Sequence, residues 1–207
     1  MTLAKHKLDA VCLDALREVG NIGAGHAMTA LAELLNQTVD MSVPHVGITA
    51  LGDFVAMAGG PEAVSVGVYM YVDGEAPGHV AFLLPIRDAF RMIDQLLMQD
   101  MGTTQELDEM ATSALKEMGN IMASSYLVAI SDMTGLNLLS SPPEILTDMT
   151  AAIVSNITAE LVQDEDSVLT IITEICHESG SARGSFTYIP EEGSLSKLLA
   201  ALGLEGV

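Results

Sequence analysis

The chain carries one eleven-residue pattern twice, at a fixed distance along the sequence. Residues 14–24 read DALREVGNIGA and residues 113–123 read SALKEMGNIMA, with identical Ala, Leu, Glu, Gly, Asn, Ile and Ala positions. The offset of 99 residues continues without a gap to Pro44 and Pro143, and residues 82–85 later match 186–190 loosely. Such a repeat predicts two copies of one structural unit, about 1–100 and 101–207, within a single domain of residues 1–207 that has internal pseudo-twofold symmetry.

The alternation of apolar and polar residues within each copy predicts a long helix, then strands, then a closing helix. The first copy is expected to hold a helix at 9–36, an extended segment at 39–49, strands at 64–72 and 79–84, and a helix at 87–98. The second is expected to hold helices at 105–134, about 147–161 and 194–202, and strands at 167–176 and 183–189. Because short turns join the strands, the sheet should be largely antiparallel. The predicted fold class is α/β (α+β), a two-layer sandwich of long helices on that sheet.

Each repeated pattern places a narrow polar strip along its long helix. At about 100° per residue, Glu18 and Asn21 fall on one side of the helix and Leu16 on the side to be buried. The strip comprises Asp14, Glu18, Asn21 and Gly25 in the first copy, and Ser113, Glu117, Asn120 and Ser124 in the second. A solvated helix face needs polarity but no particular residue, and Asn is a mediocre helix former. The repeated Glu and Asn therefore favour a functional role, although common descent of the copies or packing would also preserve them.

The shared glycines Gly20 and Gly119 project off this strip. A glycine inside a helix costs about 1 kcal/mol relative to Ala, so we expect both to permit the close approach of another element. Gly20, Gly23 and Gly25 together reverse the order of the dinucleotide-binding G-x-G-x-x-G pattern and lie within a helix rather than after a strand. Nucleotide binding is therefore not predicted.

Composition excludes several classes of function. The chain has 8 Lys and Arg against 28 Asp and Glu, and its net charge of −20 disfavours binding to nucleic acid or an anionic membrane. It has no apolar run long enough to span a bilayer and no apolar signal core behind its first residues, so a cytoplasmic location is expected. Cys12 and Cys176 form no close pair and the five histidines show no ligand spacing, so no metal site is predicted. The methionines are expected mostly to fill the core, among them Met92, Met98, Met101, Met110, Met118, Met122 and Met133.

The doubled pattern [Asp/Ser]-x-x-x-Glu-x-x-Asn resembles the CheC/CheX/FliY family of chemotaxis phosphatases. The segments EVGNIGAG at 18–25 and EMGNIMAS at 117–124 look like the CheC group in particular. The resemblance covers essentially the whole chain, including PPEILTDMTAAI at 142–153. Two intact motifs argue against CheX, and no switch domain of the FliY type is expected.

This resemblance implies hydrolysis of the aspartyl phosphate on the response regulator CheY. The regulator itself would hold Mg²⁺, so the chain needs no cofactor of its own. By similarity, Asn21 and Asn120 would place a water in line with the phosphorus, and Glu18 and Glu117 would pair with a lysine of the regulator. Supporting or rim positions would be Asp14 and Ser113. The helical wheel places Gly25 and Ser124 on the same strips. Their small size would let the regulator approach the helix there.

The resemblance also implies binding to the receptor deamidase CheD, through the helix expected from about residue 147. Asp148 is the candidate contact, and capping of that helix is the alternative role for its carboxylate. The chain could instead be a non-catalytic adaptor that binds phosphorylated CheY, CheD or both. A structural component of the flagellar switch is a weaker alternative. We expect a monomer with internal pseudo-symmetry.

Overall fold

The computed structural model describes residues 10–159, 167–177 and 180–203 of the chain. In this part of the chain the helices are α1 (Ala10–Leu35), α2 (Leu51–Met57), α3 (Ile86–Leu96), α4 (Glu109–Thr134), α5 (Thr150–Thr158) and α6 (Ser194–Ala201). The strands are β1 (Asp40–Ala50), β2 (Val64–Gly74), β3 (Gly78–Pro85), β4 (Leu138–Ser140), β5 (Glu144–Met149), β6 (Ser167–His177) and β7 (Gly180–Pro190). All seven strands form one antiparallel sheet in the order β1-β6-β7-β3-β2-β4, and β5 also pairs with β2.

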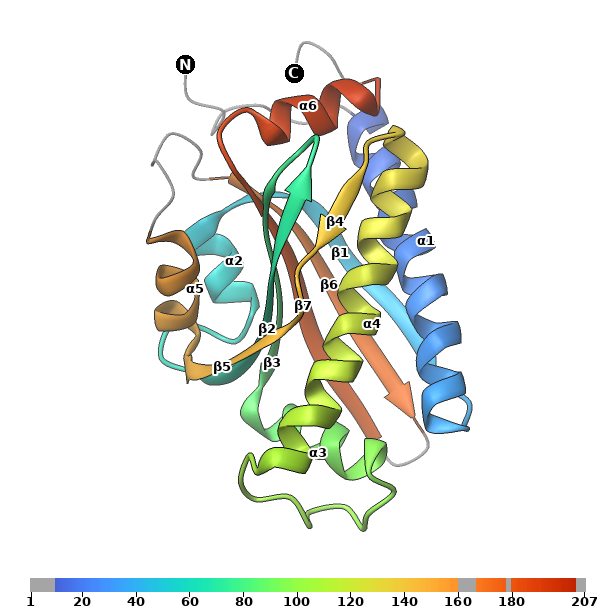
Figure 1. The fold of residues 1–207 in the computed structure, drawn as a ribbon, viewed down its shortest axis with the longest axis vertical. Coiled ribbons are helices and arrows are strands. Elements are labelled where there is room, and N and C mark those ends of the chain that lie inside the picture. The colour runs from blue at the N-terminus through green and yellow to red at the C-terminus, as the bar shows by residue number, and fades with distance from the viewer. Residues whose placement is uncertain (1–9, 160–166, 178–179, 204–207) are drawn as a thin grey trace.

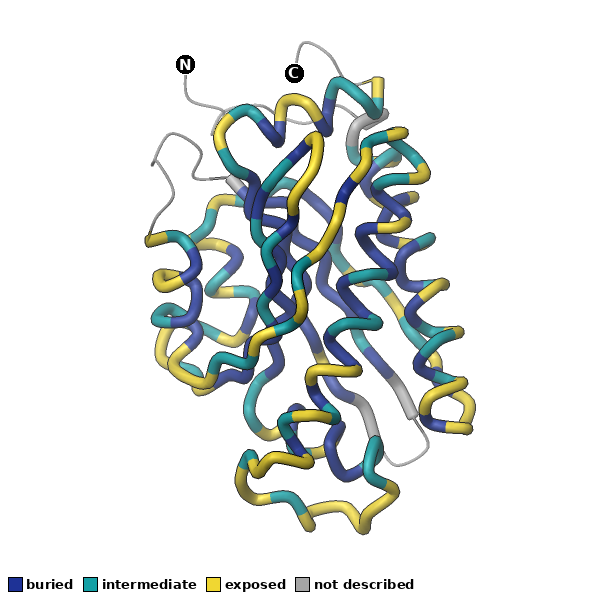
Figure 2. The backbone as a smooth tube through the Cα atoms, in the orientation of Figure 1, coloured by how far each residue is buried: buried dark blue, intermediate teal, exposed yellow. Residues whose placement is uncertain are grey.

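The long helices pack on one face of this sheet, which confirms the predicted α/β class. Figure 1 shows α1 and α4 side by side and antiparallel, with the sheet between them and the shorter pair α2 and α5. The larger core lies between the sheet and α1, α3, α4 and α6. A smaller core on the opposite face joins Phe54 of α2 and Ile153 of α5 to Leu83 of β3. Figure 2 shows the buried backbone concentrated in the sheet and on the inner sides of the helices.

The two copies are interlocked through the sheet. Strand β1 of the first copy pairs with β6 of the second, and β5 of the second pairs with β2 of the first. At the centre, β3 pairs with β7 and Phe82 lies opposite Phe186. These two residues are equivalent in the sequence match, so the pseudo-twofold axis passes between them. Each copy thus contributes its first strand to the hairpin of the other.

Proline shapes the first strand of each copy differently. In β1 the pairing register shifts between Ser42 and His45, around Pro44. In the second copy Pro142 and Pro143 separate β4 from β5. Proline lacks the N–H needed for ladder pairing, and each of these strands lies at an outer side of the sheet where that loss is tolerated. Helix α2 follows β1 as α5 follows β5, and α2 was not predicted.

Several predicted helix boundaries are correct and two are wrong. Asn36 ends α1 as expected, with a left-handed φ of 49°. Helix α4 begins at Glu109 instead of 105, because the Asp108 side chain caps it by accepting a hydrogen bond of 2.7 Å from the Ala111 backbone N–H. Helix α5 begins at Thr150 instead of about 147, because pairing of β5 with β2 continues to Met149.

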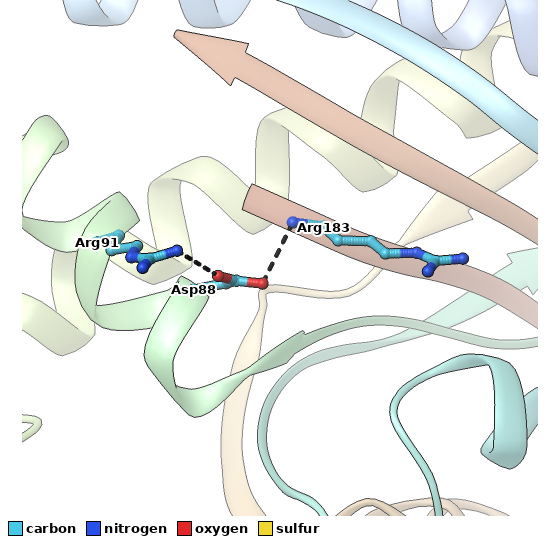
Figure 3. A network of polar contacts seen from close by, with 3 residues as sticks. All are labelled: Asp88, Arg91 and Arg183. Carbon is cyan, nitrogen blue, oxygen red and sulfur yellow. Dashed lines mark hydrogen bonds and ion pairs between the residues drawn. The ribbon is translucent and has the colours of Figure 1, made fainter. Parts of the chain in front are cut away.

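A polar contact ties α3 to the second copy (Figure 3). The Asp88 carboxylate accepts a hydrogen bond from the Arg91 guanidinium at 3.4 Å and another from the backbone N–H of Arg183 in β7 at 3.4 Å. Asp88 is half-buried. Its hydrogen bond to β7 supplements the packing of α3 against that strand.

Among the described residues, no helix is both long and apolar enough to cross a membrane. The side chains of Cys12 and Cys176, and the first nine residues, lie outside what the structure describes.

Candidate functional site

Both polar strips face outward, as the helical spacing predicted. Asp14, Glu18 and Asn21 are exposed on α1, and Ser113 and Glu117 are exposed on α4. Asn120 is half-buried, and so are Gly25 and Ser124, the last residues of the two strips. The structure therefore brings together the residues of each motif on one helix face, and places the two motifs on neighbouring antiparallel helices.

The shared glycines hold each motif helix against the sheet. A methyl group at Gly20 would lie 2.7 Å from Cγ2 of Val46 in β1, and one at Gly119 would overlap with Val68 in β2. The prediction that these glycines permit close approach is confirmed. Because each helix is fixed from beneath, its motif side chains project from a rigid surface.

Gly25 has a different environment from these packed glycines. A methyl group built on it would meet no atom of the chain outside its neighbours within 4 Å. Internal packing therefore does not require glycine here, although glycine lowers the stability of a helix by about 1 kcal/mol relative to Ala. The open space lies one turn beyond Asn21, where an approaching molecule would contact the helix backbone.

The two motifs differ in their immediate surroundings. In the first, the guanidinium of Arg17 lies 3.3 Å from the Asp14 carboxylate, with both side chains largely exposed. The second motif has Ser113 at the equivalent position, so the same ion pair cannot form with Lys116. The first amide, Asn21, is exposed, whereas the second, Asn120, is half-buried.

A shallow hollow lies beside Asn21, between α1 and the edge strand β1. It is lined by Asn21, Gly25 and Met28 from the helix and by Met41 and Val43 from the strand. The hollow puts apolar surface directly next to the exposed amide. A partner that touches Asn21 can therefore also bury apolar surface there.

The site offers carboxylate and amide groups and lacks a cluster of metal ligands. Within the described ranges, no group of three or more His, Cys, Asp or Glu side chains could hold a metal ion. A carboxamide both donates and accepts hydrogen bonds, and a carboxylate pairs with a cation. Each strip can thus orient a polar molecule and bind a basic group on a partner.

Comparison with known proteins assigns the chain to a family. The profile of the CheC-like family matches it twice, over residues 12–48 and 110–146, and each match contains one complete motif. CheY-P phosphatase CheC from Bacillus subtilis (strain 168) is 36% identical over 199 residues, which cover 92% of this chain and 93% of that protein. The chain belongs to the CheC-like family.

Other relatives of this CheC-like chain are flagellar proteins. Flagellar motor switch phosphatase FliY from Bacillus subtilis (strain 168) is 32% identical over 139 residues, which cover 66% of this chain but only 36% of that protein. The crystal structure of Thermotoga maritima FliY has a TM-score of 0.77 and 20% identity, and the match covers 96% of this chain and 98% of that chain. This structural likeness supports the CheC-like fold.

Asp148 lies away from both motifs of this CheC-like chain. It belongs to β5, opposite Ser65 of β2, and is exposed. Its Oδ1 accepts a hydrogen bond of 2.7 Å from the backbone N–H of Met149, the residue that precedes α5. The prediction that Asp148 begins a helix is wrong, and its side chain makes no capping bond to α5.

The expectation for the methionines is only partly correct. Met92, Met118 and Met122 are buried in the core as predicted. Met98, Met101 and Met110, however, are 70%, 42% and 61% exposed. All three lie at the end of the molecule where α3 leads into α4, and sequence periodicity did not distinguish them from core residues.

Proposed function

We propose that this chain is a phosphatase that hydrolyses the aspartyl phosphate of the response regulator CheY. The observation that carries this proposal is the pair of equivalent outward-facing Glu and Asn residues, Glu18 with Asn21 and Glu117 with Asn120, on two rigid helices. The name and 36% identity of the Bacillus subtilis relative support the substrate.

The two asparagines act by placing water. An acyl phosphate is already reactive, and Mg²⁺ bound by the regulator neutralises its charge, so the phosphatase needs mainly to orient the nucleophile. The amide of Asn21 or Asn120 holds a water in line with the phosphorus and adds no negative charge there. The oxygen of that water bonds to phosphorus, the bond from phosphorus to the aspartate oxygen breaks, and the proton of the water passes to phosphate or solvent.

The two glutamates position the regulator. Glu18 and Glu117 each lie about one turn before an asparagine, and each pairs with a lysine beside the phosphoryl group of the regulator. Asp14 and Ser113 support the rim of the interface. Gly25 leaves open space for the regulator, and Ser124 provides a small side chain at the same place in the second motif.

Phosphate release from a phosphorylated receiver domain tests this function. We expect the wild-type chain to accelerate release, the single variants Asn21→Ala and Asn120→Ala to keep part of the acceleration, and the double variant to lose it. Glu18→Gln and Glu117→Gln should raise KM more than they lower kcat, because they weaken docking. Wild-type chain that binds the phosphorylated domain without accelerating release would instead support the adaptor function.

Asp148 is the proposed contact for CheD. Its carboxylate is exposed, and it belongs to β5, which pairs with β2 at an outer side of the sheet. Asp148→Lys should abolish binding to CheD and leave phosphate release unchanged. Unchanged binding to CheD would refute the assignment.

A further inference from the structure

A second hollow lies beside the second motif, at the opposite end of the helix pair from the start of α1. It is formed by the last turn of α1, the end of α3 and the first turns of α4. Its lining includes Leu34, Leu96, Leu97, Met110, Ser113 and Glu117. Two motif residues, Ser113 and Glu117, thus form one wall, and apolar side chains form the rest.

The surface around this hollow is unusually apolar for an exposed region. Leu34 is 41% exposed and Met110 is 61% exposed. Met98, which follows Leu97, and Met101 add further exposed apolar surface in the connection to α4. These four residues are half of the eight large apolar side chains exposed in the described part of the chain. A cluster of this kind indicates a surface that contacts another molecule.

We propose that this hollow receives an apolar side chain of the receiver domain that docks on Glu117 and Asn120. The proposal rests on the function proposed above and adds an affinity determinant to its second site. Glu117 and Met110 lie three and ten residues before Asn120 and both line the hollow, so it extends from about 4.5 to 15 Å along the helix from the amide at 1.5 Å per residue. The receiver should therefore carry an exposed apolar side chain about 5–15 Å from its phosphoryl group and on the side of its lysine.

The energetics of docking favour such an anchor. An exposed ion pair between Glu117 and a lysine contributes little to affinity, because solvent screens it and two flexible side chains must be ordered. Binding energy in protein interfaces concentrates instead in a few large side chains, aromatic ones among them, that fill well-packed and desolvated pockets. Glu117 belongs to both the polar strip and the hollow, so one docked domain covers both.

The first motif has its apolar hollow in a different place. There the hollow adjoins Asn21 and Gly25 and extends toward Met41 of β1. At the second motif the hollow adjoins Ser113 and Glu117 and extends toward Leu34 of α1 and the end of α3. A receiver therefore makes different apolar contacts at the two motifs, although their polar residues match.

Single-site backgrounds test this proposal. Leu34→Glu, Met110→Glu and the milder Met110→Gln are introduced into Asn21→Ala, where only the second motif acts, and into Asn120→Ala, where only the first acts. Steady-state phosphate release from the phosphorylated receiver gives KM and kcat, and circular dichroism verifies folding. We expect KM to rise at least about fivefold in the Asn21→Ala background with kcat kept, and no change in the Asn120→Ala background.

Met149→Glu is the matched control, because Met149 is 46% exposed and lies at the end of β5 before α5. It should leave KM unchanged in both backgrounds. An unchanged KM for all three variants in the Asn21→Ala background, or an equal rise in both backgrounds, would overturn the proposal. Failure of the proposed function would give a different result. The Asn21→Ala, Asn120→Ala double variant would then still accelerate phosphate release, with or without a substitution at Met110.

Discussion

Gly23 of α1 lies directly against the ring of Tyr126 of α4, where a methyl group on Gly23 would overlap with the ring carbons. The ring cannot easily move aside, because its hydroxyl shares a hydrogen bond of 2.7 Å with Thr173 and its face packs against Phe186 at a centroid distance of 4.6 Å. Burial raises the pKa of Tyr126 to about 12, so its phenol stays neutral and keeps that bond. This contact fixes the relative position of the two motif helices.

Gly23→Ala should therefore destabilise the chain. Overpacking of a buried contact typically costs about 1–3 kcal/mol, which exceeds the gain in helix propensity of about 1 kcal/mol. We expect a net decrease of up to about 2 kcal/mol in the free energy of unfolding, measured by urea denaturation. Gly25→Ala is the control, because its methyl group enters open space and should raise stability by up to about 1 kcal/mol. A stabilising Gly23→Ala would contradict the packing described.

A large side chain at Gly25 should impair the first site without unfolding the chain. In the Asn120→Ala background, Gly25→Leu should lower the acceleration of phosphate release by at least about tenfold, because displacement of the reacting groups by about 1 Å can reduce rates that strongly. In the Asn21→Ala background the same substitution should have no effect. Full activity of Gly25→Leu in the first background would show that the regulator does not approach there.

Asp94 should stabilise the connection between α3 and α4 in a pH-dependent way. Burial by itself raises the pKa of its carboxyl, but hydrogen bonds from Thr104, Gly102 and Thr103 outweigh that effect and hold the pKa below its ordinary value. The backbone N–H groups of Gly102 and Thr104 donate to it at 2.6 and 2.8 Å. Asp94→Asn should lower the free energy of unfolding by about 2 kcal/mol at pH 7.

The sign of this pH dependence follows from the lowered pKa. The folded state favours the charged carboxylate, so the contribution is complete above the ordinary pKa of about 4 and is lost as the pH falls through the lower folded value. The difference between wild type and Asp94→Asn should therefore shrink on acidification below pH ~4. Asp100→Asn replaces an exposed carboxylate in the same connection and should change stability little at pH 7. A difference that grows on acidification would refute the assignment.

The two copies should not fold separately. A fragment of residues 1–104 contains β1 without β6, β3 without β7, and β2 without β4 and β5, so four strand pairings are missing. We expect no cooperative thermal transition for this fragment alone by circular dichroism, and recovery of one when it is mixed with residues 105–207. A sharp transition in the isolated fragment would contradict the interlocked topology.

The repeat allowed much of this fold to be predicted. A full comparison of the two copies would have predicted further elements. Helical periodicity placed α1 and α4 and set their outward faces, because 3.6 residues per turn leaves little freedom over seven turns. The offset of 99 residues also relates β1 to β4 and β5, and α2 to α5. Transferring an element from one copy to the other would have found α2 and corrected the start of α5.

The pairing between copies and the second hollow could not be predicted in the same way. The apolar pattern of β1 is satisfied equally by its own hairpin or by β6, so only the three-dimensional arrangement decides. The hollow combines Leu34, the end of α3 and Met110, which are distant in sequence. Met110 is the same residue type as the methionines of the core, and only its exposure in the structure distinguishes it from them.

The central claim is that two amides position the attacking water, and single-turnover kinetics tests it most directly. Excess Asn21→Ala, Asn120→Ala double variant is mixed with a phosphorylated receiver domain, and its affinity is measured separately with a receiver loaded with beryllofluoride. We predict that saturating double variant leaves phosphate loss at the rate of the receiver alone, while affinity is retained because the two glutamates and the apolar hollows beside the motifs still dock the domain. Acceleration that persists at saturation would contradict the account.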